Sequence, residues 1–340
     1  MSDAIEAHIA LMEQGAAKAA RWIVRHQGAD GTPPSRTDVI ESAYKGIWSL
    51  AFTGHSQAAQ LLAEWYRRRL AEDGDFPCRR EEGAFLDGHY LYANGYIAIG
   101  ARVAGRFDLA QPAIDFIATR QHLATGGFFS NGPHIASPVE RMDTVSTSIS
   151  AWAAIFAGRL DIARRAAEFL EAVIESQPDP RTFFFPTMGP SGTLLDTPVG
   201  AESHVVMDVG DADQDWYFIG LPPIVLAQLY AATSETRWLD LACRYLDYLD
   251  TSCNPGAFND FSSGKSGVAA AHLFRLTGRN RYREIALHVA DFILSKQTSW
   301  GFFCENSEIY GGPAITLSWS DLDMTLEYVL WLKLSAMHLA

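Results

Sequence analysis

Hydrophobic side chains recur with helical spacing along most of this chain, and they follow a repeated pattern. An amphipathic segment ends in Gln or Asp, a turn of glycine and aromatic residues follows, and a more apolar segment with a polar start comes next. The stretch Arg120–Trp152 shows the turn and what flanks it: a helix ends at Gln121, Gly126–Phe129 forms the turn, and a second helix begins at Asp143 and Thr144. Because an apolar period near 3.6 residues is typical of helices, each copy predicts a helix pair.

The pattern occurs six times, as in repeat architectures. Strand-like alternation is confined to a few residues near Phe183 and Val205. The terminal helices are as apolar as the middle ones, whereas an open solenoid needs polar caps at its ends. We therefore predict an all-α fold, an (α/α)6 toroid in which residues 1–340 form a single domain. The predicted outer and inner helices are Ile5–His26 with Ile40–Phe52, Ser56–Leu70 with Asp87–Gly105, Phe107–Gln121 with Asp143–Phe156, Leu160–Gln177 with Trp216–Thr233, Trp238–Leu249 with Ser262–Thr277, and Tyr282–Gln297 with Trp319–Met337.

Composition and charge narrow the function. The net charge of −13 leaves no basic excess to neutralise phosphates, which argues against a nucleic-acid-binding protein. The first residues lack the apolar region of a signal peptide, and no apolar stretch reaches the roughly 18 residues that a membrane span needs. The cysteines are scattered, without metal-ligand spacing. We expect a cytoplasmic protein with free thiols, no membrane span and no cofactor.

Polar residues gather where the inner helices begin. In a toroid these helices start at one end, so their N-termini, with partial positive charge and unpaired N–H groups, point at a common funnel. Each Asp or Ser there can be an N-cap, worth about 1 kcal/mol. The starts of the inner helices contain more polar residues than capping requires, which predicts a polar cavity. The candidate substrate-binding residues are His89, Tyr90, Asn94, His204, Asp213, Asp215, Trp216, Asp260, Trp319, Asp321 and Asp323.

The most acidic run is Asp208–Asp215. Its spacing resembles the start of a calcium loop, but Trp216 takes the place of the required glycine and no glutamate closes the loop. We therefore interpret the run as charge at a helix start and predict no metal.

Four segments, in order Phe85–Tyr92, Met142–Thr144, Asp260–Ala271 and Ser318–Glu327, are similar to the motifs of six-hairpin glycosidases, nearest to the unsaturated glucuronyl and rhamnogalacturonyl hydrolases. The chain departs from the pattern at Leu86, where the family has His, and at Ser320, where it has Gly. The resemblance implies a carbohydrate-active enzyme that hydrates or hydrolyses a glycoside, such as a 4,5-unsaturated uronic acid.

In this interpretation Asp143 is the general acid/base and Asp87 is its partner carboxylate. One carboxyl group must be protonated near neutral pH, and a nearby carboxylate together with a partly dry pocket raises a pKa in that direction. His89 and His204 would bind the uronate carboxylate. The expected partner is a small molecule, an oligosaccharide.

Two alternatives stay open. Gln121–Phe129 and Asp143–Thr147 resemble prenyltransferase and squalene-cyclase repeats, and Asp211–Asp215 and Asp321–Thr325 are similar to the acid motif of class II terpenoid cyclases. There an Asp protonates an alkene of an isoprenoid, aromatic faces stabilise the cations, and the cavity is mostly apolar. A non-catalytic binding toroid is the second alternative, but its buried carboxylates would lack a reason. The polar helix starts favour the carbohydrate interpretation.

Overall fold

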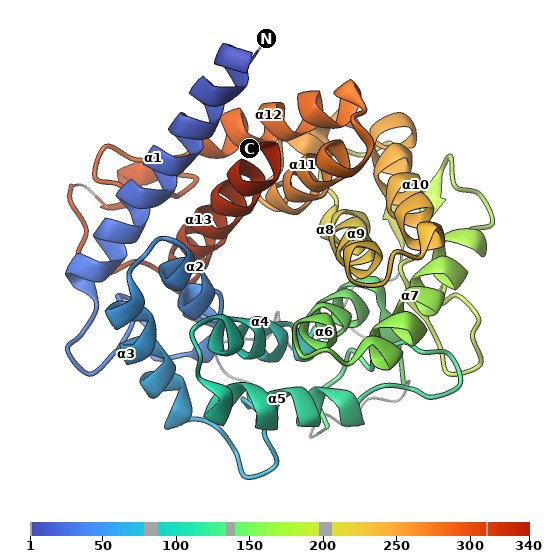
Figure 1. Cartoon of the computed structure of the whole chain (residues 1–340), viewed down its shortest axis with the longest axis horizontal. Helices are drawn as coiled ribbons and strands as arrows, with labels where there is room; N and C mark the ends of the chain where they lie inside the picture. Colours follow the sequence, from blue (N-terminus) through green and yellow to red (C-terminus); the bar gives the residue numbers. More distant parts are fainter. Residues whose placement is uncertain (1, 78–87, 134–139, 197–205, 311) are drawn as a thin grey trace.

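The helices of the protein form a closed ring of two layers (Figure 1). The computed structural model describes residues 2–77, 88–133, 140–196, 206–310 and 312–340. Each outer helix is followed along the chain by an inner one, so the predicted (α/α)6 toroid is confirmed.

The predicted helices are present, with ends shifted by a few residues in most cases. The outer layer consists of α1 (Ser2–His26), α3 (Ser56–Arg67), α5 (Phe107–Thr119), α7 (Leu160–Glu175), α10 (Thr236–Ser252) and α12 (Asn280–Ser295). The inner layer consists of α2 (Gly46–Phe52), α4 (Leu91–Val103), α6 (Thr144–Phe156), α9 (Pro222–Thr233) with the short α8 (Tyr217–Gly220) before it, α11 (Gly264–Thr277) and α13 (Trp319–Leu339). Short 3-10 turns are η1 (Ile40–Ser42), η3 (Pro255–Phe258) and η4 (Ser307–Tyr310).

The two layers differ in burial as their sequences predict. In the outer helix α7 a single stripe, including Ile162, Phe169 and Val173, is buried, while Asp161 and Glu168 face solvent. In the inner helix α6 every residue from Thr144 to Ala154 is buried. An inner helix is surrounded by neighbours, so it needs small or apolar residues on all faces, whereas an outer helix needs only one apolar face.

The last helix closes the ring. α13 lies between α11 and α2 in the inner layer and packs against α1 outside it (Figure 1). Ser49 of α2 donates a hydrogen bond to the carbonyl oxygen of Leu326 in α13, at 2.8 Å. Because both terminal helices are covered in this way, neither needs the polar face that caps an open solenoid.

The glutamine that follows an outer helix fastens that helix to the next one. Gln121 donates from Nε2 to the carbonyl oxygens of Gly126, in its own turn, at 2.9 Å, and of Ile162, in α7, at 3.0 Å. Gln27 and Gln297 make the equivalent pairs of bonds, to α3 and α1 respectively. The recurring Gln-Gly-aromatic segment therefore has a structural role: its glutamine joins neighbouring outer helices of the toroid.

The described segments contain two short antiparallel ribbons, and the first of them leads into α6. β1 (Met142–Asp143) pairs with β3 (Thr187–Met188), and β2 (Phe183–Phe184) pairs with β4 (Met207–Asp208). The strand expected near Phe183 is thus present, while Val205 lies outside the described residues. The first ribbon fixes the backbone at Asp143, the residue that caps α6.

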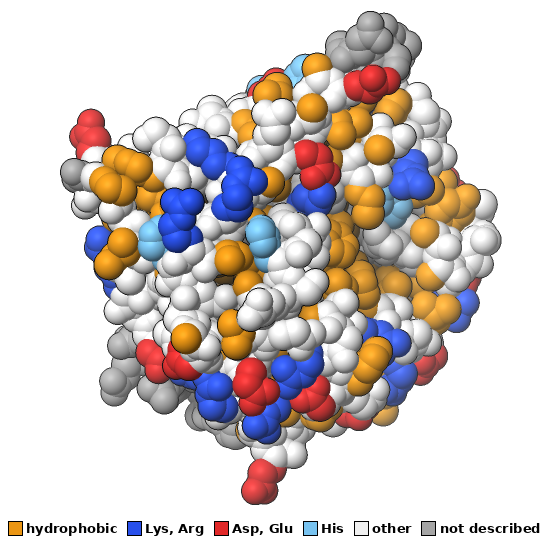
Figure 2. Space-filling model, turned by 60° about the vertical axis from the view of Figure 1, so that its left-hand side comes forward, with side chains coloured by type: hydrophobic (Ala, Val, Ile, Leu, Met, Phe, Trp, Pro, Cys, Tyr) orange, Lys and Arg blue, Asp and Glu red, His pale blue; other side chains and the backbone are white. Residues whose placement is uncertain are grey.

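The outer surface carries charges of both signs, interspersed on the face that Figure 2 shows. Some pair neighbouring outer helices, as Arg244 of α10 does with Glu175 of α7 at 3.1 Å. Exposed pairs of this kind contribute about 0–1 kcal/mol each. No described helix has the length and apolarity needed to cross a membrane. The cysteines that the structure describes, Cys243, Cys253 and Cys304, are free thiols.

Candidate active site

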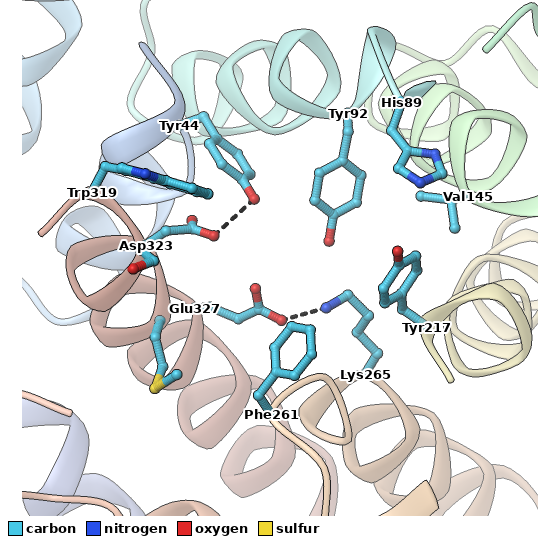
Figure 3. Close-up of a pocket in the computed structure, with 12 residues that line it drawn as sticks. Tyr44, His89, Tyr92, Val145, Tyr217, Phe261, Lys265, Trp319, Asp323 and Glu327 are labelled. Atoms are coloured by element: carbon cyan, nitrogen blue, oxygen red, sulfur yellow. Dashed lines mark hydrogen bonds and ion pairs between the residues drawn. The ribbon is translucent and has the colours of Figure 1, made fainter. Parts of the chain in front are cut away.

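A pocket of about 210 Å³ lies where the inner helices begin (Figure 3). The predicted common funnel is therefore confirmed, and it has room for one substituted six-membered ring, since roughly 150 Å³ holds a benzene ring. The residues that line it are Tyr44, His89, Tyr92, Val145, Tyr217, Phe261, Lys265, Trp319, Ser320, Asp323, Met324 and Glu327.

The walls of the pocket are mostly aromatic, which corrects the expectation of a polar cavity. Tyr44, Tyr92, Tyr217, Phe261 and Trp319 supply most of the wall, and they come from the helix starts rather than from the glycine-aromatic turns. Charged groups are gathered on the side formed by α11 and α13 (Figure 3). The pocket thus combines ring faces with one concentrated polar cluster.

That cluster consists of two lysines and two carboxylates. Lys45 Nζ lies 2.8 Å from Asp323 Oδ1 and 2.5 Å from Glu327 Oε2, and Lys265 Nζ donates to the other oxygen of Glu327. Trp331 Nε1 donates to Glu327 at 2.7 Å. The Lys45 side chain is 0 % exposed and that of Glu327 is 9 % exposed. Buried charges persist only when they are paired, and here the opposite charges balance.

Local sequence brings these groups together in pairs. Asp323 and Glu327 are four residues apart on α13, so they lie on one face of the helix, one turn apart. Lys45 immediately precedes α2, beside Tyr44, whose hydroxyl donates to Asp323 at 3.0 Å. Lys265 is in the first turn of α11. Closure of the helical ring then brings the two lysines and the two carboxylates into contact at one side of the pocket.

The two carboxyl groups have very different proton affinities. Burial raises the pKa of Asp323 to about 6; Lys45 opposes this rise and the neighbouring Glu327 adds to it. Burial would raise the pKa of Glu327 as well, but Lys265 and Lys45 outweigh that effect and lower it to about 2. Pairs whose environments push their pKa values apart are typical of acid–base sites. Near neutral pH a fraction of Asp323 holds a proton while Glu327 is ionised.

His89 lies across the pocket from Asp323 (Figure 3) and forms a second pair, with Asp143. His89 Nδ1 is 3.2 Å from Asp143 Oδ2, and both side chains are almost fully buried. Asp143 also caps α6 by accepting from the Ser146 N–H at 2.6 Å. Burial would raise the pKa of Asp143, but His89 together with hydrogen bonds from Ser130 and Ser146 lowers it below its usual value. Asp143 does not line the pocket; it holds His89, which does.

Three of the predicted site residues line the pocket: His89, Trp319 and Asp323. Asp87, the predicted partner of Asp143, and His204 lie outside the described residues.

Tyr90 and Asn94 support the fold near the site. The Tyr90 hydroxyl donates to the buried carboxylate of Asp75, and Asn94 Oδ1 accepts from the backbone N–H of Phe76 at 3.0 Å. Both side chains therefore fasten the turn that follows α3 to the start of α4, and neither lines the pocket.

The other predicted residues also lie away from the pocket. Asp260 and Asp321 accept hydrogen bonds from the hydroxyl groups of Ser262 and Ser318, near the starts of α11 and α13. Asp213 is exposed, Asp215 is half-buried, and Trp216 is buried and donates to a loop carbonyl oxygen at 3.1 Å. These five are absent from the pocket lining.

No three or more His, Cys, Asp or Glu side chains of the described segments are grouped closely enough to hold a metal ion. In the acidic loop, Asp208 and Asp211 accept backbone N–H groups two residues further on, at 2.9 and 3.2 Å. The acidic side chains thus serve the turns of an exposed loop.

Four residues of the pocket and its charged cluster are absent from the predicted site residues: Lys45, Lys265, Glu327 and Tyr92. A signal for three of them exists: Lys45, Lys265 and Glu327 are charged residues at or inside the predicted inner helices, among mostly apolar neighbours. Such a charge needs a partner inside the ring.

No protein-family model matches the sequence, and no curated protein sequence matches it. Solved structures do. The chain is similar to an α-1,6-mannanase from Salegentibacter sp. (13 % identity, TM-score 0.65, 96 % of this chain and 99 % of that one), and to a D-mannose isomerase (13 % identity, TM-score 0.64, 98 % and 97 %). An unsaturated glucuronyl hydrolase specific for heparin is also similar (11 % identity, TM-score 0.56, 94 % and 96 %). The likeness is one of fold. It confirms the resemblance to the six-hairpin group at that level.

Proposed function

We propose that this protein is a carbohydrate-active enzyme that holds one sugar unit in the pocket and acts on it by acid–base catalysis, with Asp323 as the acid. The observation that carries the proposal is a carboxyl group with a pKa near 6 facing a ring-sized aromatic pocket. Aromatic faces can cover the C–H faces of a sugar ring, and the charged cluster can bind its hydroxyl groups. The fold supports the proposal, because the similar solved structures are a mannanase, a sugar isomerase and a glucuronyl hydrolase.

The same geometry supports a division of roles. Asp323 protonates the glycosidic oxygen, or the enol-ether carbon of an unsaturated uronic acid, and an oxocarbenium-like cation develops. The ionised Glu327 lies one helical turn away and stabilises that positive charge. His89, oriented by Asp143, takes a proton from the attacking water on the opposite side of the pocket. An acid and a base on opposite faces of the sugar predict inversion at the reacting carbon.

Asp143 has a supporting role in this proposal. Its carboxylate is held ionised and turned toward His89, so it orients the base as the aspartate of a catalytic triad does. An inactive variant of the Salegentibacter mannanase replaces two consecutive aspartates, whereas this chain contains no two consecutive aspartates. The catalytic acid is therefore assigned from the residues that line this protein's own pocket, which gives Asp323.

A terpenoid cyclase is the second candidate, favoured by the aromatic walls around Asp323. There Asp323 would protonate an alkene and the ring faces would stabilise the carbocation. The charged cluster around Lys45 and Lys265 weighs against this alternative, because the hydrocarbon chain of an isoprenoid has no hydroxyl groups for the cluster to bind.

The test is turnover of mannan oligosaccharides, unsaturated oligouronides, free mannose and a linear isoprenoid by the wild type and three variants. Asp323→Asn should lower kcat roughly 10²- to 10⁴-fold on the true substrate. Asp143→Asn should also lower it. Asp321→Asn is the matched control, since Asp321 lies on the same helix without lining the pocket, and it should keep wild-type turnover.

Wild-type activity of Asp323→Asn on that substrate would overturn the assignment of the acid. Product stereochemistry, followed by nuclear magnetic resonance, checks the arrangement of acid and base: retention would contradict it. Turnover of the isoprenoid alone would select the cyclase.

A further inference from the structure

Lys265 is a buried amine at the wall of the pocket. Its side chain is 4 % exposed, and it extends toward the pocket centre in Figure 3. Lys18, Lys296 and Lys333 are partly exposed and lie outside this site. A lysine that is buried yet faces a cavity differs from the solvated lysines that charge a surface.

Lys265 differs from the other buried lysine in how it uses its donors. Lys45 Nζ contacts Asp323, Glu327 and the Tyr44 hydroxyl, and Lys45 does not line the pocket. Lys265 Nζ has one hydrogen-bond partner among the described residues, Glu327. An ammonium group carries three donors, so Lys265 has N–H bonds left for a molecule in the pocket.

We propose that Lys265 is a carbonyl-binding residue, whose amine forms a reversible imine with an aldehyde or ketone in the pocket, such as the open-chain form of a small sugar. This goes beyond the proposed function, because it needs neither a glycosidic bond nor the proton of Asp323.

The step balances within the site. The Lys265 ammonium gives one proton to the carbonyl oxygen of the bound aldehyde or ketone, and the freed amine attacks the carbonyl carbon. A carbon–nitrogen bond forms and the carbon–oxygen π bond breaks. The oxygen takes up that proton and the second N–H proton and leaves as water, so a protonated imine replaces the ammonium with no change in charge. No oxidant or reductant is needed.

The surroundings of Lys265 favour both the free amine that attacks and the protonated imine that forms. Burial lowers the pKa of Lys265; Glu327 opposes the shift and Lys45 adds to it, and the net direction is downward. Desolvation and a second cation are the means by which proteins activate lysine nucleophiles. The protonated imine keeps a positive charge where the ammonium stood, 5.9 Å from the Tyr217 ring centre and 5.6 Å from that of Trp331. Ring faces at that distance stabilise a cation.

The experiment uses glycolaldehyde, the smallest sugar aldehyde, with sodium cyanoborohydride to reduce any imine to a stable secondary amine. Peptide mass mapping of the intact wild-type chain over time then measures the reaction of each lysine. Lys265 should react at least roughly tenfold faster than Lys333, which also pairs with a carboxylate but lies outside the pocket. Equal rates, an unmodified Lys265, or preferential reaction at Lys45 would overturn the proposal.

Two variants separate the pocket from general reactivity. Lys265→Arg keeps the positive charge next to Glu327 and should lose the fast-reacting site while Lys333 reacts as before. Val145→Phe narrows the pocket without changing a lysine and should slow the reaction at Lys265; an unchanged rate would contradict imine formation in the pocket and overturn the proposal. Asp323→Asn should keep the fast reaction, so the outcome does not depend on the proposed function.

Discussion

Replacing Lys45 by methionine should destabilise the protein strongly, because two buried carboxylates share its ammonium. Nζ lies 2.8 Å from Asp323 and 2.5 Å from Glu327, and it donates to the Tyr44 hydroxyl at 2.6 Å. Methionine keeps a long unbranched side chain and removes the charge. The substitution therefore isolates the electrostatic contribution.

The magnitude follows from burial. The side chain of Lys45 is 0 % exposed, and those of Asp323 and Glu327 are 16 % and 9 % exposed. Removing one partner of a buried pair costs about 3–5 kcal/mol, because a charge is left without compensation. Glu327 keeps Lys265, so the lower end, about 3 kcal/mol near pH 8, is expected. Lys333→Met is the matched control: its pair with Glu13 is 21 % and 43 % exposed and should contribute about 0–1 kcal/mol.

The pH dependence gives a second check on the same variant. Burial already raises the pKa of Asp323 to about 6, and loss of Lys45 should raise it further. A carboxyl whose folded pKa lies above its unfolded value stabilises the fold at low pH, and this stabilisation is lost as the pH rises through the folded pKa. The deficit of Lys45→Met should therefore shrink as the pH falls from about 8 to about 5.

Urea unfolding followed by circular dichroism, at both pH values, measures the free energy of unfolding for the wild type and both variants. Equal losses for Lys45→Met and Lys333→Met would refute the reasoning, as would a deficit that grows at the lower pH.

Three further predictions concern stability. The stacked, buried His272 and His338 have pKa values lowered, chiefly by burial, to about 3 and about 4, so wild-type stability should fall as the pH drops below the unfolded value near 6.5. His338→Phe should flatten that profile in urea titrations across pH, and an unchanged slope would contradict this. Gly158→Ala, at φ +75° with open space around it, should lower the free energy of unfolding by about 1–2 kcal/mol. Gly126→Ala, at φ +80°, should lower it more, because the new Cβ would lie 2.1 Å from a backbone oxygen. Thermal melts that rank the two variants in the reverse order would show that the turn at Gly126 adjusts. Trp331→Phe removes the indole N–H that binds the buried glutamate and should lower unfolding free energy by about 1.5–3 kcal/mol, measured in urea, while wild-type stability would show that the hydrogen bond is dispensable.

The fold could be predicted because its information is local. The outer helix α7 buries one stripe and the inner helix α6 is buried throughout its first eleven residues, and both properties are readable from spacing and composition. Closure followed from the apolar terminal helices. The position of the site was also predictable, since all six inner helices begin at the same end of the ring, and His89, Trp319 and Asp323 were among its candidates.

The choice of residues at that end was not predictable, because it depends on helix rotation. One residue turns an α-helix by about 100°, so Asp321 and Asp323 face different directions although they are two positions apart. Asp321 accepts a hydrogen bond from Ser318, the residue that caps α13, and Asp323 enters the pocket. The same argument separates Tyr90, which donates to Asp75, from Tyr92, which lines the cavity.

Local sequence patterns specify the order of the helix pairs, their two layers, and the end of the ring at which the pocket lies. Which charges meet there depends on the tertiary structure. Lys45 and Asp323 are 278 positions apart, and Lys265 and Glu327 are 62 apart, so no local pattern joins them. Their meeting depends on ring closure by α13. The altered pKa values of Asp323, Lys265 and Glu327 then follow from burial and from the neighbouring charges, which a sequence specifies only through the complete fold.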